Sequence, residues 1–163
     1  MIYYREPSKR SQGGYGLSVG AWGTGSFQND SASDWFYTVE EAVEPGLVIA
    51  SALDDALAEA GYLELDSASA AIAAAELLAS CAGLAADDLP DHIRRWVAEH
   101  SHQPYTAEIE QAVHAVERVR GESELRELWD EEQGPENTWL VAVDDLIARV
   151  GRAGTDAPAA LQP

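Results

Sequence analysis

A run of seventeen residues at positions 67–83, SASAAIAAAELLASCAG, constrains the fold more than any other part of this chain. Its side chains are small or apolar, and Glu76 is its only charge. A helix that is apolar nearly all round belongs at the centre of a domain, and its alanines let neighbouring helices approach closely. We therefore expect a central helix here, capped by Asp66 or Ser67 and ended by Gly83.

Most other segments show the helical periodicity of a single apolar face. Asn29 or Asp30 can cap the first such helix, and Pro45-Gly46 breaks the chain after it. The stretch YLELD at 62–66 alternates, but one short stretch does not make a sheet. The sequence therefore predicts an all-α fold, a compact bundle of six to seven helices. Besides the central helix, the predicted helices fall within residues 32–43, 47–60, 91–100, 106–121, 123–132 and 139–150.

The length of 163 residues suits one domain with its own hydrophobic core. Residues 1–18 are basic, rich in glycine and serine and without periodicity, so we interpret them as a flexible N-terminal extension. Residues 19–152 are predicted to form the single helical domain. The composition of residues 153–163 indicates a disordered tail.

The charge is strongly and unevenly negative, with 29 acidic against 10 basic residues and a formal net charge of −19. Residues 1–18 contain Arg5, Lys9 and Arg10 against Glu6, a net charge of +2, which leaves −21 for the rest. Such a field repels phosphate backbones and anionic membranes and attracts basic partners. We therefore expect a basic protein as partner, and neither nucleic acid nor a membrane. The alternative is that the charge serves only solubility or a salt-tolerant host.

Cys81 is the only cysteine, so neither an intrachain disulfide nor a cysteine cluster for a metal can form. It lies in an apolar run, where a buried and inert thiol is expected. No apolar run has transmembrane length, and the first residues lack the apolar segment of a signal peptide. We therefore expect a cytoplasmic protein.

The stretch GAWGTGSFQND at 20–30 differs from the helical remainder in its glycines and aromatic residues. It lacks the lysine and hydroxyl of a phosphate-binding P-loop and the G-x-G-x-x-G spacing of dinucleotide-binding loops. We predict a structural clasp, in which glycines permit a tight turn with positive φ. Trp22 and Phe27 are then expected to insert into the bundle against helices bearing Trp35 and Trp139. The predicted clasp residues are Gly20, Trp22, Gly23, Gly25, Phe27 and Trp35.

No residues assemble a nucleophile, a base and an orienting group, so we assign no catalytic residue, metal ligand or cofactor. Neighbouring carboxylates in the acidic doublets diverge by about 100° on a helix. His100 and His102 lack further ligands at a metal-binding spacing. The alternative to a purely structural loop is a ligand-binding site at Asn29, Asp30 and Asp34, because the two aspartates share a helix face at i, i+4.

The segment VGAWGTGSFQNDSASDWFYTVEEA at 19–42 resembles the opening of the DUF4259 family of bacterial proteins, a domain of unknown function. Members typically begin with a Gly-Ala-Trp-Gly segment, followed by a phenylalanine, an Asn-Asp pair and an Asp-Trp dipeptide. The resemblance continues through residues 123–131 and the helix with Trp139, and it covers roughly residues 19–152. It implies that residues 1–18 are an extension, and it implies no activity. The matching positions are Gly20, Ala21, Trp22, Gly23, Phe27, Asn29, Asp30, Asp34 and Trp35.

The small helical scaffold, the negative charge and the lack of a catalytic set of residues favour a non-enzymatic protein that binds another protein. Neutralisation of a basic partner, as by immunity proteins or antitoxins, is one form of such a function. The alternative is a small-molecule or metal-dependent enzyme with its site near Asn29, Asp30 and Asp34. A third interpretation gives every motif an intramolecular role and the charge a role in solubility alone.

Overall fold

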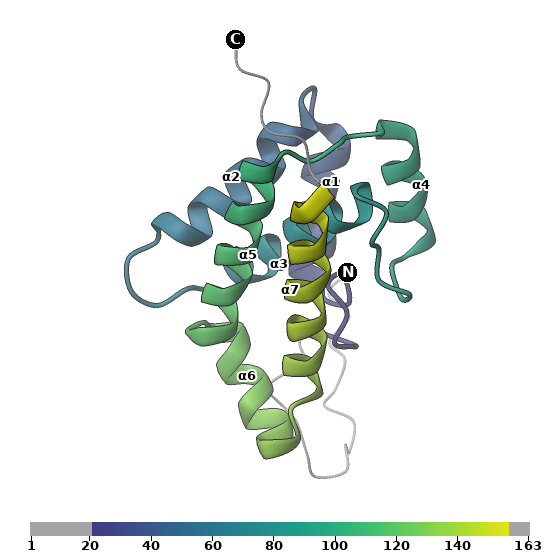
Figure 1. Ribbon diagram of the computed structural model, residues 1–163. Helices are drawn as coiled ribbons and strands as arrows, with labels where there is room; N and C mark the ends of the chain where they lie inside the picture. Colours follow the sequence, from purple (N-terminus) through teal and green to yellow (C-terminus); the bar gives the residue numbers. More distant parts are fainter. Residues whose placement is uncertain (1–20, 157–163) are drawn as a thin grey trace, which may run out of the picture.

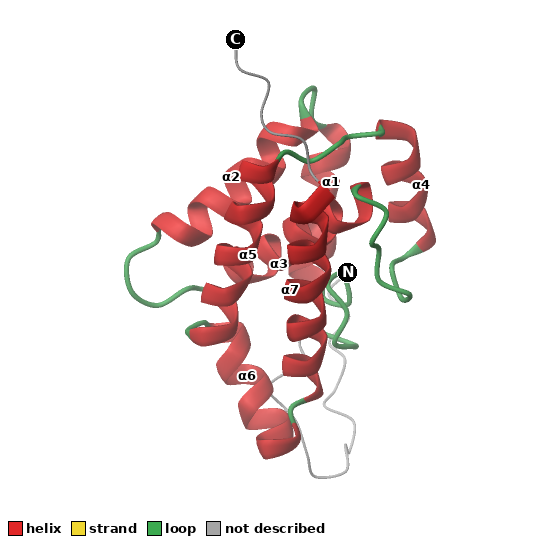
Figure 2. Cartoon of the chain, viewed as in Figure 1, coloured by secondary structure: helices red, strands yellow, loops and turns green. Residues whose placement is uncertain are grey.

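Seven α-helices and one 3-10 helix build the structure, a computed structural model that describes residues 21–156 (Figure 1). Loops and turns join the helices, and the described part contains no strand (Figure 2). Its β-type pairs are two isolated bridges, Ala21 with Asn29 and Leu63 with Ser123. The predicted all-α bundle is confirmed. The elements are α1 (Asp30–Glu41), α2 (Pro45–Ala58), α3 (Leu65–Cys81), α4 (Asp91–His100), α5 (Thr106–Gly121), α6 (Glu124–Gln133), η2 (Gly134–Glu136) and α7 (Thr138–Asp156).

Helix α3 lies at the centre of the bundle and packs against each of the other six α-helices. Every residue from Ala71 to Ser80 is buried. Around it, α5 packs against α7 and α2, so that the outer helices also contact one another. Because burial of apolar surface drives folding, the nearly all-apolar sequence of α3 places it at the centre, and this prediction is confirmed.

The helix starts follow local rules at some positions and long-range contacts at others. The Asn29 side chain caps α1 by accepting a hydrogen bond of 2.8 Å from the backbone N–H three residues later. Helix α3 begins at Leu65, so Asp66 and Ser67 lie inside its first turn and neither caps it, contrary to the prediction. Instead, the Glu124 carboxylate accepts from the Leu65 N–H at 2.8 Å. This contact is possible because α6 packs against α3.

Helix α3 ends at a left-handed glycine, as predicted. Gly83 has φ of +81°, a conformation that glycine adopts without steric cost. Its N–H donates to the Ser80 carbonyl at 3.0 Å, and the next N–H, that of Leu84, donates to the Ala79 carbonyl at 2.9 Å. The turn directs the following loop back along α3, where it reaches a buried carboxylate described below.

The two ends of the chain differ in how far they are described. Helix α7 continues to Asp156, whereas the disordered tail was predicted to begin at residue 153. The rest of the predicted tail, the predicted extension at 1–18 and Gly20 lie outside the described residues. Within residues 21–156, no helix has the length and apolar character needed to cross a membrane.

Candidate functional site

The N-terminal loop, residues 21–29, folds back on itself before α1. The Trp22 N–H donates to the Gln28 carbonyl and the Gln28 N–H to the Gly25 carbonyl, each at 3.0 Å. A Cβ on Gly25 would lie 2.5 Å from Oδ2 of Asp88, and a Cβ on Gly23 would meet the Gln28 side chain. A side chain at either position would therefore displace the Gln28 or Asp88 side chain. Neither glycine has the positive φ that the sequence led us to expect.

The two aromatic residues of this loop occupy opposite environments. Phe27 is 3% exposed, and its ring packs edge-on against Phe36 with centroids 5.7 Å apart. Trp22 is 63% exposed, so the prediction that it inserts into the bundle is wrong. The reason lies in the backbone: Ala21 packs against the core, and successive side chains of extended chain point to opposite sides. Trp22 therefore faces solvent.

Trp35 and Trp139, the other aromatic residues that we expected to pack against the loop, do not form ring contacts with Phe27 among the described residues. The ring packed edge-on against Phe27 is that of Phe36, and Trp139 is buried at 3% exposure in α7. Trp35 packs against the core at its edge and is only partly buried, and it lines a surface groove instead. The loop is thus anchored by a single aromatic side chain.

The predicted ligand residues do not converge on one point. The Asn29 side-chain oxygen is occupied as the cap of α1, at 2.8 Å from a backbone nitrogen. Asp30 and Asp34 are exposed on α1. None of the three lines the groove described below. The structure therefore gives Asn29 a capping role and leaves both aspartates on the outer face of the helix.

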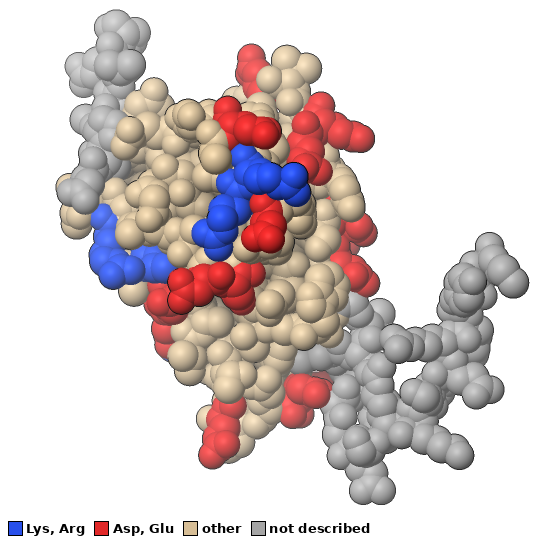
Figure 3. Space-filling model, turned by 90° about the vertical axis from the view of Figure 1, so that its right-hand side faces the viewer, with Lys and Arg blue, Asp and Glu red and all other residues tan. Residues whose placement is uncertain are grey.

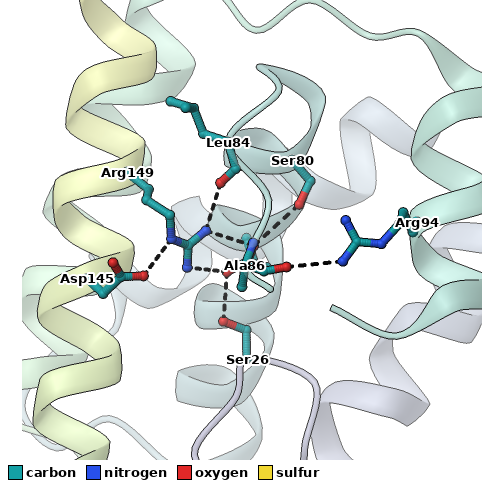
Figure 4. Close-up of polar contacts among 8 residues, drawn as sticks. Ser26, Ser80, Leu84, Ala86, Arg94, Asp145 and Arg149 are labelled. Carbon is teal, nitrogen blue, oxygen red and sulfur yellow. Dashed lines mark hydrogen bonds and ion pairs between the residues drawn. The ribbon is translucent and has the colours of Figure 1, made fainter. Parts of the chain in front are cut away.

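A carboxylate towards the C-terminal end of α3 binds the N-terminal loop to the core (Figure 4). Glu76 is fully buried, with 0% exposure. One oxygen, Oε1, accepts from Ser80 Oγ at 3.3 Å, from the Ala86 N–H at 3.0 Å and from Nη1 of Arg149 at 2.9 Å. The other, Oε2, accepts from Ser26 Oγ at 3.1 Å and from Nη2 of Arg149 at 2.8 Å. Five donors saturate a carboxylate, which has about four acceptor sites.

The partner guanidinium is almost as deeply buried, because Arg149 is 7% exposed. Besides its two bonds to Glu76, it donates to the Leu84 carbonyl at 2.9 Å and to Oδ2 of Asp145 at 2.6 Å. Burial lowers the pKa of Arg149, but its hydrogen bonds to Glu76 and Asp145 outweigh this and raise the pKa above the ordinary value. The pair is a bidentate, fully bonded ion pair that joins α3, α7, the N-terminal loop and the loop after α3.

Sequence reasoning identified Glu76 as the one charge of the central helix but did not assign it a partner. The signal was present, since a buried carboxylate has to be paired. Arg149 interrupts the apolar stripe of α7, next to the buried Val150. A single arginine within such a stripe is the feature that could have identified the partner. Ser26 had no comparable signal, because its contact depends on the path of the loop.

A groove of about 460 Å³ opens on the surface between α1, α2 and the start of α3. Its two carboxylates come from different helices, Asp55 from α2 and Asp66 from α3. Asp66 accepts a hydrogen bond from Ser31 Oγ at 2.6 Å, and Asp55 accepts one from Ser51 Oγ at 3.4 Å. No basic residue is among the described residues that line it. The lining residues are Trp35, Leu47, Val48, Ser51, Ala52, Asp55, Asp66, Ser67 and Ala70.

The two histidines singled out from the sequence have local partners. The His100 ring stacks on Trp96 with centroids 4.0 Å apart, and its Nδ1 lies 2.7 Å from the Trp96 carbonyl oxygen. His102 Nε2 lies 3.2 Å from the Glu108 carboxylate at the start of α5. Across residues 21–156, no three His, Cys, Asp or Glu side chains gather as a metal-ligand group.

Fold and contacts together define an all-α domain whose N-terminal loop is bonded to a buried Glu–Arg pair and which carries an acidic groove at its surface. A family model described as a domain of unknown function, DUF4259, matches residues 20–141, and the chain belongs to this family. The match therefore includes the whole N-terminal loop and ends in the first turn of α7. No match was found among curated proteins or among solved structures.

Proposed function

We propose that this chain is a non-enzymatic protein-binding module whose partner is a basic protein. The observation that carries the proposal is the imbalance of charge available at the surface. Residues 21–156 contain seven arginines and no lysine. Arg94 and Arg118 donate to backbone carbonyls of loops, and Arg120, Arg126 and Arg149 pair with carboxylates. Most of the positive charge is therefore committed to contacts within the chain.

The carboxylates, by contrast, remain largely uncommitted. On the face drawn in Figure 3, the basic side chains lie beside acidic ones, and further acidic side chains extend beyond them. Most of the exposed carboxylates make no ion pair with another described residue. They include Asp34, Glu40, Glu41, Glu44, Glu110, Glu117, Glu131 and Glu132.

A surface field of one sign accelerates the encounter with a partner of the opposite sign. Because salt screens charges over roughly 8–10 Å at physiological ionic strength, such binding weakens as salt is added. Neutralisation of a basic protein, in the manner of an immunity protein or antitoxin, fits these properties. The proposal places the chain in the cytoplasm, a setting consistent with its single cysteine.

The test is capture of partners from a lysate of the source organism at low and high salt, with the full chain as bait and mass spectrometry as readout. Two triple variants at the same three sites are compared with the parent chain. The first, Glu40→Gln with Glu41→Gln and Glu44→Gln, removes three negative charges. The second replaces the same three glutamates by aspartate and keeps the charges. We expect a basic protein that is retained at low salt, released by high salt and held less by the Gln variant than by the Asp variant. Failure to retain any protein specifically, or retention that neither salt nor the Gln variant alters, would overturn the proposal.

A further inference from the structure

We infer that the groove between α1, α2 and α3 is the docking site for the partner, and that its occupant is an amphipathic helix with arginine or lysine beside its apolar face. This inference rests on the proposed function and specifies its site and the chemistry of the partner. It follows from the apolar walls of the groove, from its carboxylates and from the charge of the whole chain.

The walls of the groove are apolar surface that the fold leaves uncovered. Trp35 contributes from α1, and Leu47 and Val48 contribute from α2. Leu47 is 65% exposed although it lies in a helix that is otherwise packed into the bundle. Ala52 and Ala70 have short side chains, so the space between the helices is not filled. A concave apolar surface of this kind provides room for an apolar side chain of a partner.

The carboxylates of the groove have unused hydrogen-bonding capacity. Asp55 and Asp66 each accept one hydrogen bond, from a serine hydroxyl, among the described residues. An ionised carboxylate has about four acceptor sites and can bind a guanidinium in a bidentate manner. An arginine or lysine that enters the groove could therefore bind a carboxylate, while its methylene groups cover the apolar wall. The partly exposed ring of Trp35 adds a face on which a guanidinium can stack.

Three other occupants fit the groove less well. The site is open to solvent on one side, whereas small-molecule sites bury about 70–90% of their ligand. A second copy of the chain would bring another net charge of −19 towards the carboxylates. Phosphate-bearing ligands are repelled for the same reason. A helix with apolar side chains at i, i+3 or i+4 and basic residues beside them matches the apolar walls and the carboxylates of the groove together.

The experiment uses a synthetic peptide of leucine, lysine and alanine with leucines at i, i+3, i+4 and i+7. A peptide of the same composition in scrambled order has the same charge but no apolar face. Binding to the full chain is measured by fluorescence anisotropy, and the binding site is mapped by ¹H–¹⁵N chemical shifts. We expect the amphipathic peptide to bind at least tenfold more tightly than the scrambled one, with the shifts concentrated at the groove.

A matched pair of variants separates apolar docking from electrostatic attraction. Leu47→Glu changes an exposed groove residue, and Val141→Glu changes an equally exposed apolar residue of α7 outside the groove. Each adds one negative charge, so attraction alone would strengthen binding of the basic peptide in both variants. We expect Leu47→Glu to weaken binding at least tenfold and Val141→Glu not to weaken it. Circular dichroism confirms that both variants are folded.

Several results would overturn the groove as the docking site. In the peptide experiment, these are equal effects of the two variants, equal binding of the scrambled peptide, or chemical-shift changes spread over the acidic surface. Displacement of the peptide by a simple alkylamine would also overturn it. So would dimerisation of the free chain that Leu47→Glu abolishes. A captured basic protein that binds the Leu47→Glu variant as tightly as the parent would refute the groove and leave the proposed function standing. Failure of both capture and peptide binding would refute the two together.

Discussion

The two ends of helix α3 each carry a carboxylate, and the structure uses them in opposite ways. Glu76 lies in the buried half, has no exposure and accepts five hydrogen bonds. Asp66 lies ten residues earlier in the first turn, is exposed and accepts one. The same functional group is thus saturated by the fold at one end and left with spare acceptor sites at the other. The comparison teaches that burial commits one carboxylate of this helix to the fold, whereas exposure leaves the other free to accept further hydrogen bonds.

The buried carboxylate is fully bonded because an unpaired charge is costly in a low-dielectric interior. A buried ion pair is stable only if the geometry is good and further hydrogen bonds satisfy both groups. Glu76 and Arg149 meet this condition, and their contacts also connect the N-terminal loop through Ser26 and the loop after α3 through Ala86. We therefore assign the pair to the architecture of the domain, whereas the proposed binding site lies at the end of α3 that is open to water.

Removing the charge of the buried carboxylate should have the largest effect on stability and therefore tests the contrast between the two ends of α3 most directly. Glu76→Gln should lower the free energy of unfolding by about 3–5 kcal/mol, because it removes the buried counter-ion of Arg149 and leaves this guanidinium only the exposed Asp145 as a charged partner. Urea denaturation followed by circular dichroism measures this. Asp145→Asn removes only the exposed partner of the same arginine, so it should cost less than about 1 kcal/mol.

The double variant Glu76→Leu with Arg149→Met tests whether the cost comes from the unpaired charge. The double variant should lose less free energy of unfolding than Glu76→Leu and Arg149→Met lose in sum, since apolar side chains can replace a buried pair. A loss below about 1 kcal/mol for Glu76→Gln would contradict the assignment of this pair to the core.

The N-terminal loop offers a second contrast, between a buried and an exposed aromatic residue. Phe27→Ala should cost about 3–5 kcal/mol, as for other large core aromatics. Trp22→Ala should change stability by no more than about 0.5 kcal/mol, because the side chain is 63% exposed. Thermal or urea unfolding of the two variants compares them directly. A loss of stability for Trp22→Ala as large as that for Phe27→Ala would mean that the Trp22 side chain is packed against the bundle and not exposed to solvent.

The thiol at the C-terminal end of α3 probes how well this end is shielded from water. Burial, with a smaller contribution from the Glu108 charge, raises the pKa of Cys81 from 9.0 to about 11. At pH 8 this lowers the thiolate fraction about 100-fold, so alkylation by iodoacetamide should be slower by a similar factor than in the unfolded chain. Mass spectrometry measures the rate, and the same reaction in concentrated urea is the control.

The sign of the pH dependence follows from the direction of this shift. Because the pKa of Cys81 is higher in the folded chain, its contribution to stability is complete below about pH 9 and is lost as the pH rises through about 11. Since this is the only cysteine, no second thiol obscures the measurement. Alkylation as fast in the folded as in the unfolded chain would show that this end of α3 opens to solvent.

The sequence predicted what depends on periodicity and missed what depends on contacts between distant segments. The central place of α3 followed from an all-round apolar segment, and Gly83 followed from helix-ending chemistry. The cap of α3 did not follow, because Glu124 reaches it from another helix. The exposure of Trp22 depends on the direction of the backbone at Ala21, which composition does not encode. The groove was equally hidden, since it is a gap between helices that each pack well elsewhere.

A smaller effect tests how the loop is held to Glu76. Ser26→Ala removes one of five donors to this carboxylate, so it should cost about 1 kcal/mol, the value typical of a single hydrogen bond. The carboxylate keeps four partners and therefore remains paired. Urea denaturation measures the loss, and Ser51→Ala, which removes an exposed 3.4 Å contact, is the control and should change little. Equal effects of the two substitutions would mean that the hydrogen bond from Ser26 to Glu76 does not hold the loop to the core.

The smallest expected change in stability belongs to the other end of α3. Asp66→Asn should alter the free energy of unfolding by less than about 0.5 kcal/mol, because the group is exposed and the Ser31 hydroxyl can still donate to the amide oxygen. The same substitution should weaken binding of the amphipathic basic peptide, since it removes one of the two charges of the groove. Asp34→Asn, on the exposed face of α1 and outside the groove, is the matched control. A loss of stability as large as that of Glu76→Gln would mean that both carboxylates of α3 serve the fold, and the contrast between its two ends would disappear.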